Sequence, residues 1–106
     1  MDGMNIAKMM KQAQKMQADM ARIQADLAQK TYAAAAGGGA VKATVNGEGE
    51  LQALAIAPEL LKDADAEMLQ DLIVTAVREA SQTAKAEAQK EMGKLTSGLN
   101  IPGLGF

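Results

Sequence analysis

Glycines cluster in the stretch Gly37–Leu51, GGGAVKATVNGEGEL, and a glycine-rich loop of this kind can hold phosphate groups. A dinucleotide-binding fingerprint needs glycine at its first, third and sixth positions, between a strand and a helix. The sixth position is Lys42 when counted from Gly37 and Gln52 when counted from Gly47. The chain also lacks the Gly-Lys-Ser/Thr sequence of a P-loop, and strand-like residues follow both glycine clusters. The spacing therefore argues against a phosphate-binding loop.

The other residue types that carry most enzyme chemistry are missing. The sequence has no cysteine and no histidine, which removes thiolate nucleophiles, the commonest metal ligand and the commonest general base. A reducing cytoplasm suits such a chain. No apolar run is long enough to cross a membrane, and no signal peptide is recognisable. We expect a cytoplasmic protein that is not an enzyme, with no cofactor, no metal, no small-molecule substrate and no membrane partner.

Basic residues form the most regular charged pattern in the chain. Four of them recur at spacings of three, four and seven, which places them on one face of a helix: Lys8, Lys11, Lys15 and Arg22. We expect Asp19 and Asp26 to lie near an apolar seam and outside this stripe. The stripe is either an ordinary solvated face or a contact surface for an anionic polymer.

The helix that carries this stripe is expected over residues 1–30. Its apolar residues follow the a/d pattern of a coiled coil over three heptads: Ile6, Met9, Ala13, Met16, Met20, Ile23 and Leu27. Twenty-seven helical residues form a rod of about 40 Å, whereas a compact chain of this length has a radius of gyration near 13 Å. The seam therefore needs a partner helix, either from this chain as a hairpin or from a second copy.

A small sheet is expected over residues 31–57. The glycines at 37–39 turn the chain, and Asn46-Gly47 predicts a tight type I′ hairpin turn with positive φ at both residues. Gly49 then allows a bulge or a second left-handed residue. The result is a three-stranded antiparallel meander. In its third strand, alternation places Leu54 and Ile56 on one face. The other face then holds Leu51, Ala53, Ala55 and Ala57.

A second helix is expected over residues 58–97, opened by Pro58 and capped by Asp63. Its first half carries an apolar face that should pack on the sheet: Met68, Leu69, Leu72, Ile73, Ala76, Val77 and Ala80. Small and polar residues dominate beyond Ala80, so the second half should project, with Lys90 and Lys94 on it. Residues 98–106 form an uncharged apolar tail that should dock on a surface.

Several sequence motifs resemble those of the YbaB/EbfC family of bacterial nucleoid-associated proteins. They occur in the family's order along nearly the whole chain: MKQAQKMQ, GGGAVKATVNGEGEL, IAPELL, EMLQDLIVTAVREA and IPGL. The resemblance implies one α+β domain over residues 1–106, with an α-β-β-β-α subunit. It further implies a tight homodimer with projecting helices and DNA binding without an enzymatic step. This chain departs from the family pattern at Ala57 and Arg78, which affects only local capping and surface detail.

The charge distribution is compatible with DNA binding. The formal net charge is −2, but residues 1–18 hold three lysines and one aspartate, whereas residues 59–71 hold one lysine and five acids. The chain has few aromatic residues, which disfavours single-strand binding by base stacking. We therefore predict a nucleoid-associated homodimer that binds double-stranded DNA. A helical protein–protein adaptor is the alternative.

Two sets of residues follow from this prediction. The expected DNA contacts are Lys8, Lys11, Lys15, Arg22, Lys90 and Lys94. The expected dimer interface comprises Met9, Met16, Met20, Ile23, Val41, Val45, Leu54 and Ile56.

Overall fold

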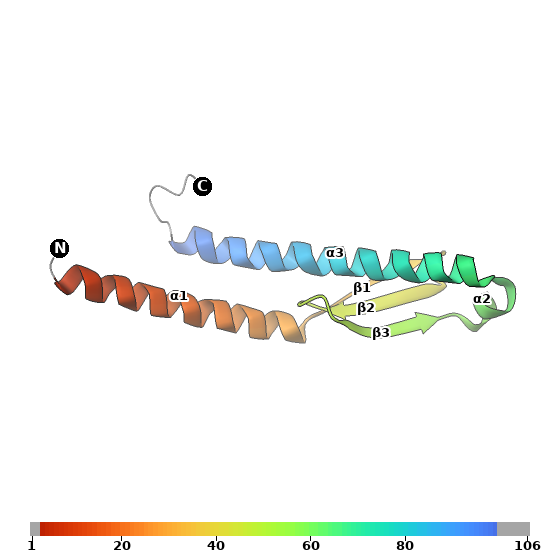
Figure 1. Cartoon of the computed structure of the whole chain (residues 1–106), viewed down its shortest axis with the longest axis horizontal. Coiled ribbons are helices and arrows are strands. Elements are labelled where there is room, and N and C mark those ends of the chain that lie inside the picture. Colours follow the sequence, from red (N-terminus) through yellow and green to blue (C-terminus); the bar gives the residue numbers. More distant parts are fainter. Residues whose placement is uncertain (1–2, 100–106) are drawn as a thin grey trace.

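The chain folds as a helix, three strands and two further helices, in the α-β-β-β-α order expected from the sequence (Figure 1). The structure is a computed structural model that describes residues 3–99. Residues 100–106, which hold most of the predicted tail, lie outside the described residues. The elements are α1 (Gly3–Gln29), β1 (Thr31–Ala36), β2 (Val41–Asn46), β3 (Leu51–Ile56), α2 (Pro58–Asp63) and α3 (Ala66–Leu99).

The three strands form an antiparallel sheet in the order β1-β2-β3, which confirms the predicted meander. Three consecutive glycines make the turn between β1 and β2, with φ angles of 65° at Gly37, 68° at Gly38 and 95° at Gly39. Residues with a Cβ rarely adopt this left-handed region, so glycine is required to turn the chain here.

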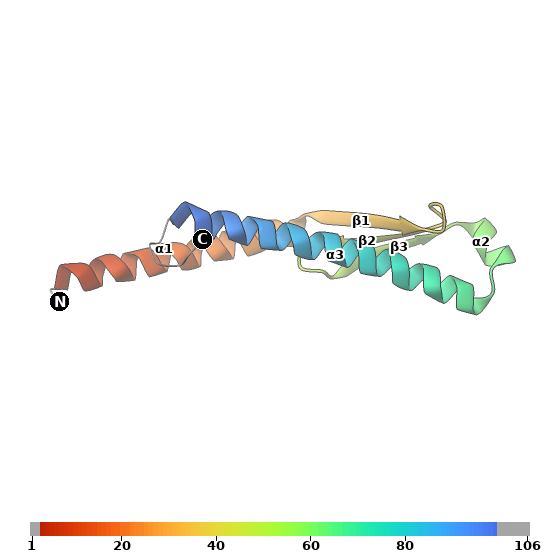
Figure 2. The same cartoon turned by 90° about the horizontal axis from the view of Figure 1, so that it is seen from above.

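The core lies where α3 crosses one face of β1 and β2 (Figure 2). Alanines at every fourth position of α3 are fully buried, and so are alternate residues of β2. Because alanine has a small side chain, the helix backbone can approach the sheet closely. The fully buried residues are Val41, Ala43, Val45, Ala76, Ala80 and Ala84.

The faces of β3 differ from the prediction because the strand contains a bulge. Val45 pairs with Leu51, while the residue before Val45 pairs with Ala53, so Gln52 is an extra residue on the β3 side. Directly paired residues share a face of the sheet. Leu51 therefore lies on the same face of the sheet as Leu54, which is the face that α3 covers on β1 and β2. The prediction that Leu51 shares the opposite face with the alanines of β3 was wrong.

The turn between β2 and β3 also differs from the prediction. The Asn46 N–H donates to the Glu50 carbonyl at 2.9 Å, which closes a three-residue loop, Gly47–Gly49. Positive φ occurs at Gly49 (87°) and not at Gly47. This is the pattern of a type I turn followed by a left-handed glycine, so the predicted two-residue type I′ turn was wrong.

The second helical region is divided, which corrects the single helix predicted over 58–97. α2 ends at Asp63, and Ala64 is extended, with φ −86° and ψ 139°. α3 then begins with its own cap, because the Met68 N–H donates to the Asp65 carboxylate at 2.7 Å. The N-cap of the long helix is therefore Asp65, and the prediction that Asp63 caps it was wrong.

The described part of the chain is an elongated body of 73 × 25 × 17 Å. Its radius of gyration is 20.6 Å, well above the value of about 13 Å for a compact chain of this length. Figure 1 shows the reason: α1 and the C-terminal half of α3 extend side by side beyond the sheet. Within the described residues, no helix is both long and apolar enough to cross a bilayer.

Candidate nucleic-acid interface

The C-terminal half of the α1 seam packs within the chain, whereas its N-terminal half has no partner among residues 3–99. Ile23 and Leu27 are buried, and Met20 is half-buried, where α1 runs beside α3. By contrast, Ile6 is 48% exposed and Met9 is 60% exposed. An intrachain helix pair therefore covers the inner half of the seam, and the outer half remains open.

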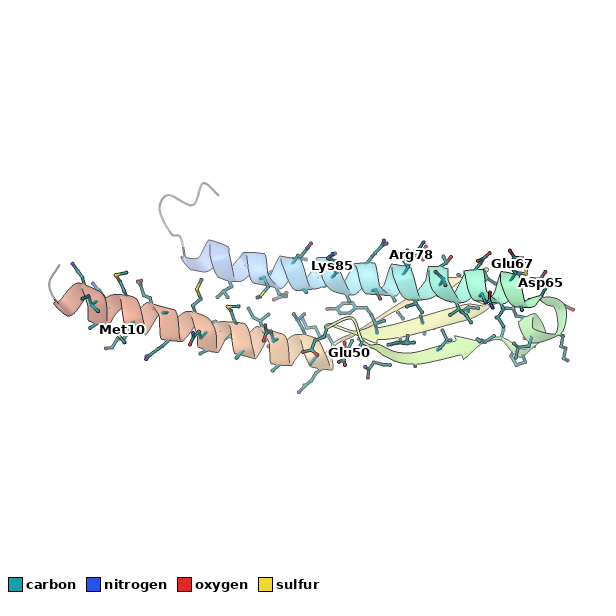
Figure 3. All side chains as sticks on the ribbon, in the orientation of Figure 1. Met10, Glu50, Asp65, Glu67, Arg78 and Lys85 are labelled. Atoms are coloured by element: carbon teal, nitrogen blue, oxygen red, sulfur yellow. The ribbon has the colours of Figure 1, made fainter. Side chains whose placement is uncertain are left out.

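We refer to residues 3–22 of α1 as the arm, because this part of the helix lies beyond the sheet, first beside α3 and then past its end. In Figure 3, Met10 lies on a part of α1 that extends past the end of α3. Lys8, Lys11 and Lys15 are all exposed on the arm, with no ion pair formed to an acidic residue of the described chain. Their cations are therefore available to an anionic ligand.

Arg22 and Lys94 differ from these lysines because each forms an ion pair with an acidic residue of its own helix. The Arg22 guanidinium lies 3.8 Å from the Asp19 carboxylate, and the Lys94 ammonium lies 3.3 Å from the Glu91 carboxylate. Exposed pairs of this kind contribute about 0–1 kcal/mol. They nevertheless reduce the positive potential around both cations.

A groove between α1 and α3 contains equal numbers of charges of each sign. Its basic residues are Lys15, Arg22 and Lys94, and its acidic residues are Asp19, Asp26 and Glu91. The prediction that Asp19 and Asp26 lie outside the basic stripe was therefore wrong, since both share the groove with two members of the stripe. Uncompensated positive charge is concentrated closer to the N-terminus, at Lys8 and Lys11.

Lys90 is exposed on α3 and does not line this groove. Figure 3 marks two further basic residues of α3: Arg78 is exposed, and Lys85 lines a pocket with Leu27 of α1 and the loop Gly47–Gly49. The structure thus brings Lys15, Arg22 and Lys94 together and leaves Lys8, Lys11 and Lys90 apart from them.

The sheet residues predicted for a dimer interface fall into two groups. Val41 and Val45 are fully buried beneath α3 of their own chain, so they already have packing partners. In contrast, β3 extends past the cover of α3: Leu54 is 39% exposed and Ile56 is half-buried. Leu51, which was not predicted, is 50% exposed on the same face. An apolar strip on β3 is therefore open to solvent.

The loop between β2 and β3 holds the C-terminal end of α1. The Gly47 N–H donates to the carbonyl of Leu27 at 2.8 Å and to that of Lys30 at 3.1 Å. A Cβ at Gly47 would lie 2.7 Å from the Leu27 carbonyl carbon, which is too close for any side chain. The sequence suggested only a turn at Gly47, because nothing in its local pattern indicates contact with a residue twenty positions away.

The described residues contain no group of three or more acidic side chains placed to hold a metal ion.

A family model for the YbaB/EbfC DNA-binding family matches residues 1–99. The chain belongs to the YbaB/EbfC DNA-binding family.

Similar proteins in this family cover almost the same length. The chain is 52% identical to a nucleoid-associated protein of Pelotomaculum thermopropionicum over 104 residues, which is 98% of this chain and 99% of the relative. It is 50% identical to a nucleoid-associated protein of Clostridium novyi, over 96% of this chain and 90% of the relative. The bacterial nucleoid-associated family expected from the motifs is therefore confirmed.

A solved structure shares the fold. An uncharacterized protein of Helicobacter pylori superimposes with a TM-score of 0.74 over 91% of this chain and 98% of that one, at 21% sequence identity.

Ala57, one of the two departures from the YbaB/EbfC pattern, has a visible local effect. It is the N-cap of α2 and forms no side-chain cap hydrogen bond. Arg78 is exposed on α3 and has no effect on the packing.

Proposed function

We propose that this member of the YbaB/EbfC family binds duplex DNA as a homodimer, without an enzymatic step, in the bacterial cytoplasm and nucleoid. The observation that carries the proposal is the set of exposed, unpaired lysines along the projecting arm: Lys8, Lys11 and Lys15. Arg22, Lys90 and Lys94 act as secondary phosphate contacts, because two of them share their charge with acidic neighbours.

The charge asymmetry along the molecule supports contact through the arm. The acidic residues of positions 59–71 lie on α2, at the junction that follows it and on the start of α3, at the opposite end of the elongated body from the arm (Figure 1). Their separation along a 73 Å axis far exceeds the screening length of about 8 Å at physiological salt. The lysines of the arm therefore attract phosphate despite the net charge of −2.

The homodimer is supported by the apolar surface that the single chain leaves open. Leu51 and Leu54 are exposed on β3, which is also an edge strand with unpaired backbone groups. Edges of this kind are favoured sites of chain pairing. A dimer through β3 would cover this strip and would present two arms to one duplex.

A helical protein–protein adaptor is the second candidate. It is favoured by the exposed apolar side chains on the outer part of the arm, Ile6, Met9 and Met10. Methionine-rich helix faces adapt well to partner helices. An adaptor would form complexes of fixed stoichiometry in the absence of DNA.

The test is equilibrium binding of the full chain to two duplexes of unrelated sequence over a range of salt concentrations. If the dimer neutralises about six phosphates, log K falls with log salt at a slope near −5. The triple variant Lys8→Ala, Lys11→Ala, Lys15→Ala should bind both duplexes more weakly and with a flatter slope while remaining folded, since phosphate contacts carry no direct sequence information.

Lys62→Ala is the matched control, because Lys62 lies on α2 within the acidic end. It should leave both the affinity and the slope unchanged. Wild-type affinity and slope in the triple variant would place the DNA contacts elsewhere. Loss of sequence preference alone would mean that the stripe reads base edges, and the phosphate model would be wrong.

A further inference from the structure

We propose that the loop from Asn46 to Glu50 fixes the direction of the arm, and that Asn46 and Gly47 are positioning residues for DNA binding. The effect of this loop on DNA binding rests on the proposed function, whereas its effect on the direction of the arm does not. Only Lys30 separates α1 from β1 along the chain. Such a short connection does not by itself define an angle, so the contacts around it must do so.

Two contacts are present: Ile23 and Leu27 of α1 are buried where α1 runs beside α3, and the Gly47 amide binds the end of α1. The last carbonyls of a helix have no partners within the helix and need donors from elsewhere. The Gly47 amide donates to one of these carbonyls, on Leu27, and also to the carbonyl of Lys30, the residue after α1. Because Gly47 has no side chain, its backbone lies directly against Leu27, where a Cβ would come within 2.8 Å of the Leu27 Cβ.

The loop that presents this amide is held rigidly by Asn46. The Asn46 side chain is buried, and its Oδ1 accepts hydrogen bonds from the amides of Glu48 at 3.0 Å and Glu50 at 2.9 Å. Its Nδ2 donates to the Glu50 carboxylate at 2.9 Å. Since Asn46 is the last residue of β2, these bonds tie the loop, and through Gly47 the end of α1, to the sheet.

The length of the arm amplifies any change at this contact. Lys8 lies nineteen residues before Leu27, about 28 Å along the helix axis. A rotation of about 10° at Leu27 would move Lys8 by about 5 Å on this lever. Phosphates follow each strand of B-DNA at about 3.4 Å of axial rise. A small rotation would therefore shift Lys8 by more than the axial rise between successive phosphates.

A purely structural turn would give a different result from a positioning loop. If the loop only closes the hairpin between β2 and β3, changing it lowers stability and leaves the arm direction and the DNA contacts as they are. If it positions the arm, the arm moves and the phosphate contacts decrease while Lys8, Lys11 and Lys15 are all still present.

The arm direction can be measured by pulsed electron paramagnetic resonance on the full chain without DNA. The sequence has no cysteine, so spin labels can be placed at Gln12→Cys on α1 and Gln82→Cys on α3, both exposed positions. Labelled chains are mixed with an excess of unlabelled chains, so that only distances within one chain are recorded. The wild-type background should give one narrow distance distribution.

Gly47→Ala and Asn46→Ala are the test variants. The first places a methyl group against Leu27, and the second removes the acceptor that holds the loop. Each should shift or broaden the distance distribution, because a rotation of about 10° at Leu27 displaces Gln12, fifteen residues away, by about 4 Å. Gly93→Ala is the matched control, because a Cβ at Gly93 meets nothing within 4 Å.

The same variants, without labels, are then tested for duplex binding. Each lost phosphate contact should weaken binding roughly fivefold at 0.15 M salt and flatten the salt slope by about 0.9. A folded Gly47→Ala or Asn46→Ala protein with the wild-type distance overturns the proposal. So does a moved arm with wild-type affinity and slope. Unfolding of both variants, with Gly93→Ala folded, also overturns it, because the loop would then be part of the folding core. If wild-type protein does not bind duplex DNA, the proposed function fails and the distances still decide the role of the loop.

Discussion

Replacing Ala80 with leucine is expected to destabilise the fold, because this position sets how closely α3 approaches the sheet. Ala80 is fully buried, between Ala76 and Ala84 on the same face of the helix, and the three pack with Val41 and its neighbours on β2. Leucine adds three carbon atoms at a contact with no free volume. Overpacking of this kind costs about 1–3 kcal/mol.

The matched control is Ala86→Leu, because Ala86 is exposed on the same helix. Both substitutions exchange alanine for another good helix former, so a difference between them reports packing against the sheet. For a domain of about 100 residues, 1 kcal/mol lowers the melting temperature by about 4–8 °C. Ala80→Leu should therefore melt about 4–24 °C below wild type, and Ala86→Leu should stay within about 4 °C of it.

The assay is thermal unfolding followed by circular dichroism, with all proteins at one protomer concentration because a dimer melts at a concentration-dependent temperature. An Ala80→Leu protein that melts at the wild-type temperature would refute the reasoning. It would mean that α3 can move away from the sheet at little cost, and that the alanines do not determine the spacing of the two layers.

Two other substitutions, each with a matched control, test the N-cap of α3 and the proposed dimer interface. Asp65→Ala should lower the free energy of unfolding by about 1 kcal/mol, because it removes the N-cap of α3. Asp63→Ala should change it by less than about 0.5 kcal/mol, and chemical denaturation would decide between Asp65 and Asp63 as the cap. Leu54→Asp should convert the proposed dimer into monomers at micromolar concentration, because it places a charge on the exposed apolar strip of β3. Ala55→Asp carries the same charge on the opposite face and should sediment as a dimer; monomers from both variants, or from neither, would argue against β3 as the interface.

Residue spacing was sufficient to predict the features that depend on short stretches of sequence. The three-and-four spacing that includes Ile23 and Leu27 predicted the long first helix, and alternation around Val41 and Val45 predicted a strand. The glycines at 37–39 predicted a turn, because only glycine readily adopts three successive positive φ angles. These features are local: period and turn chemistry act within a few residues, so the sequence alone determines them.

Other features depend on which elements meet, and only the tertiary structure decided them. Gly47 is needed for its contact with Leu27 and not for positive φ, and a bulge moves Leu51 to the face opposite the one predicted. Lys94 shares a groove with Asp19 and Asp26 because α3 lies beside α1. In each case the deciding partner is distant in sequence or depends on a shift of register. Periodicity within one segment carries no information about such a partner, since close approach is a property of two packed elements together.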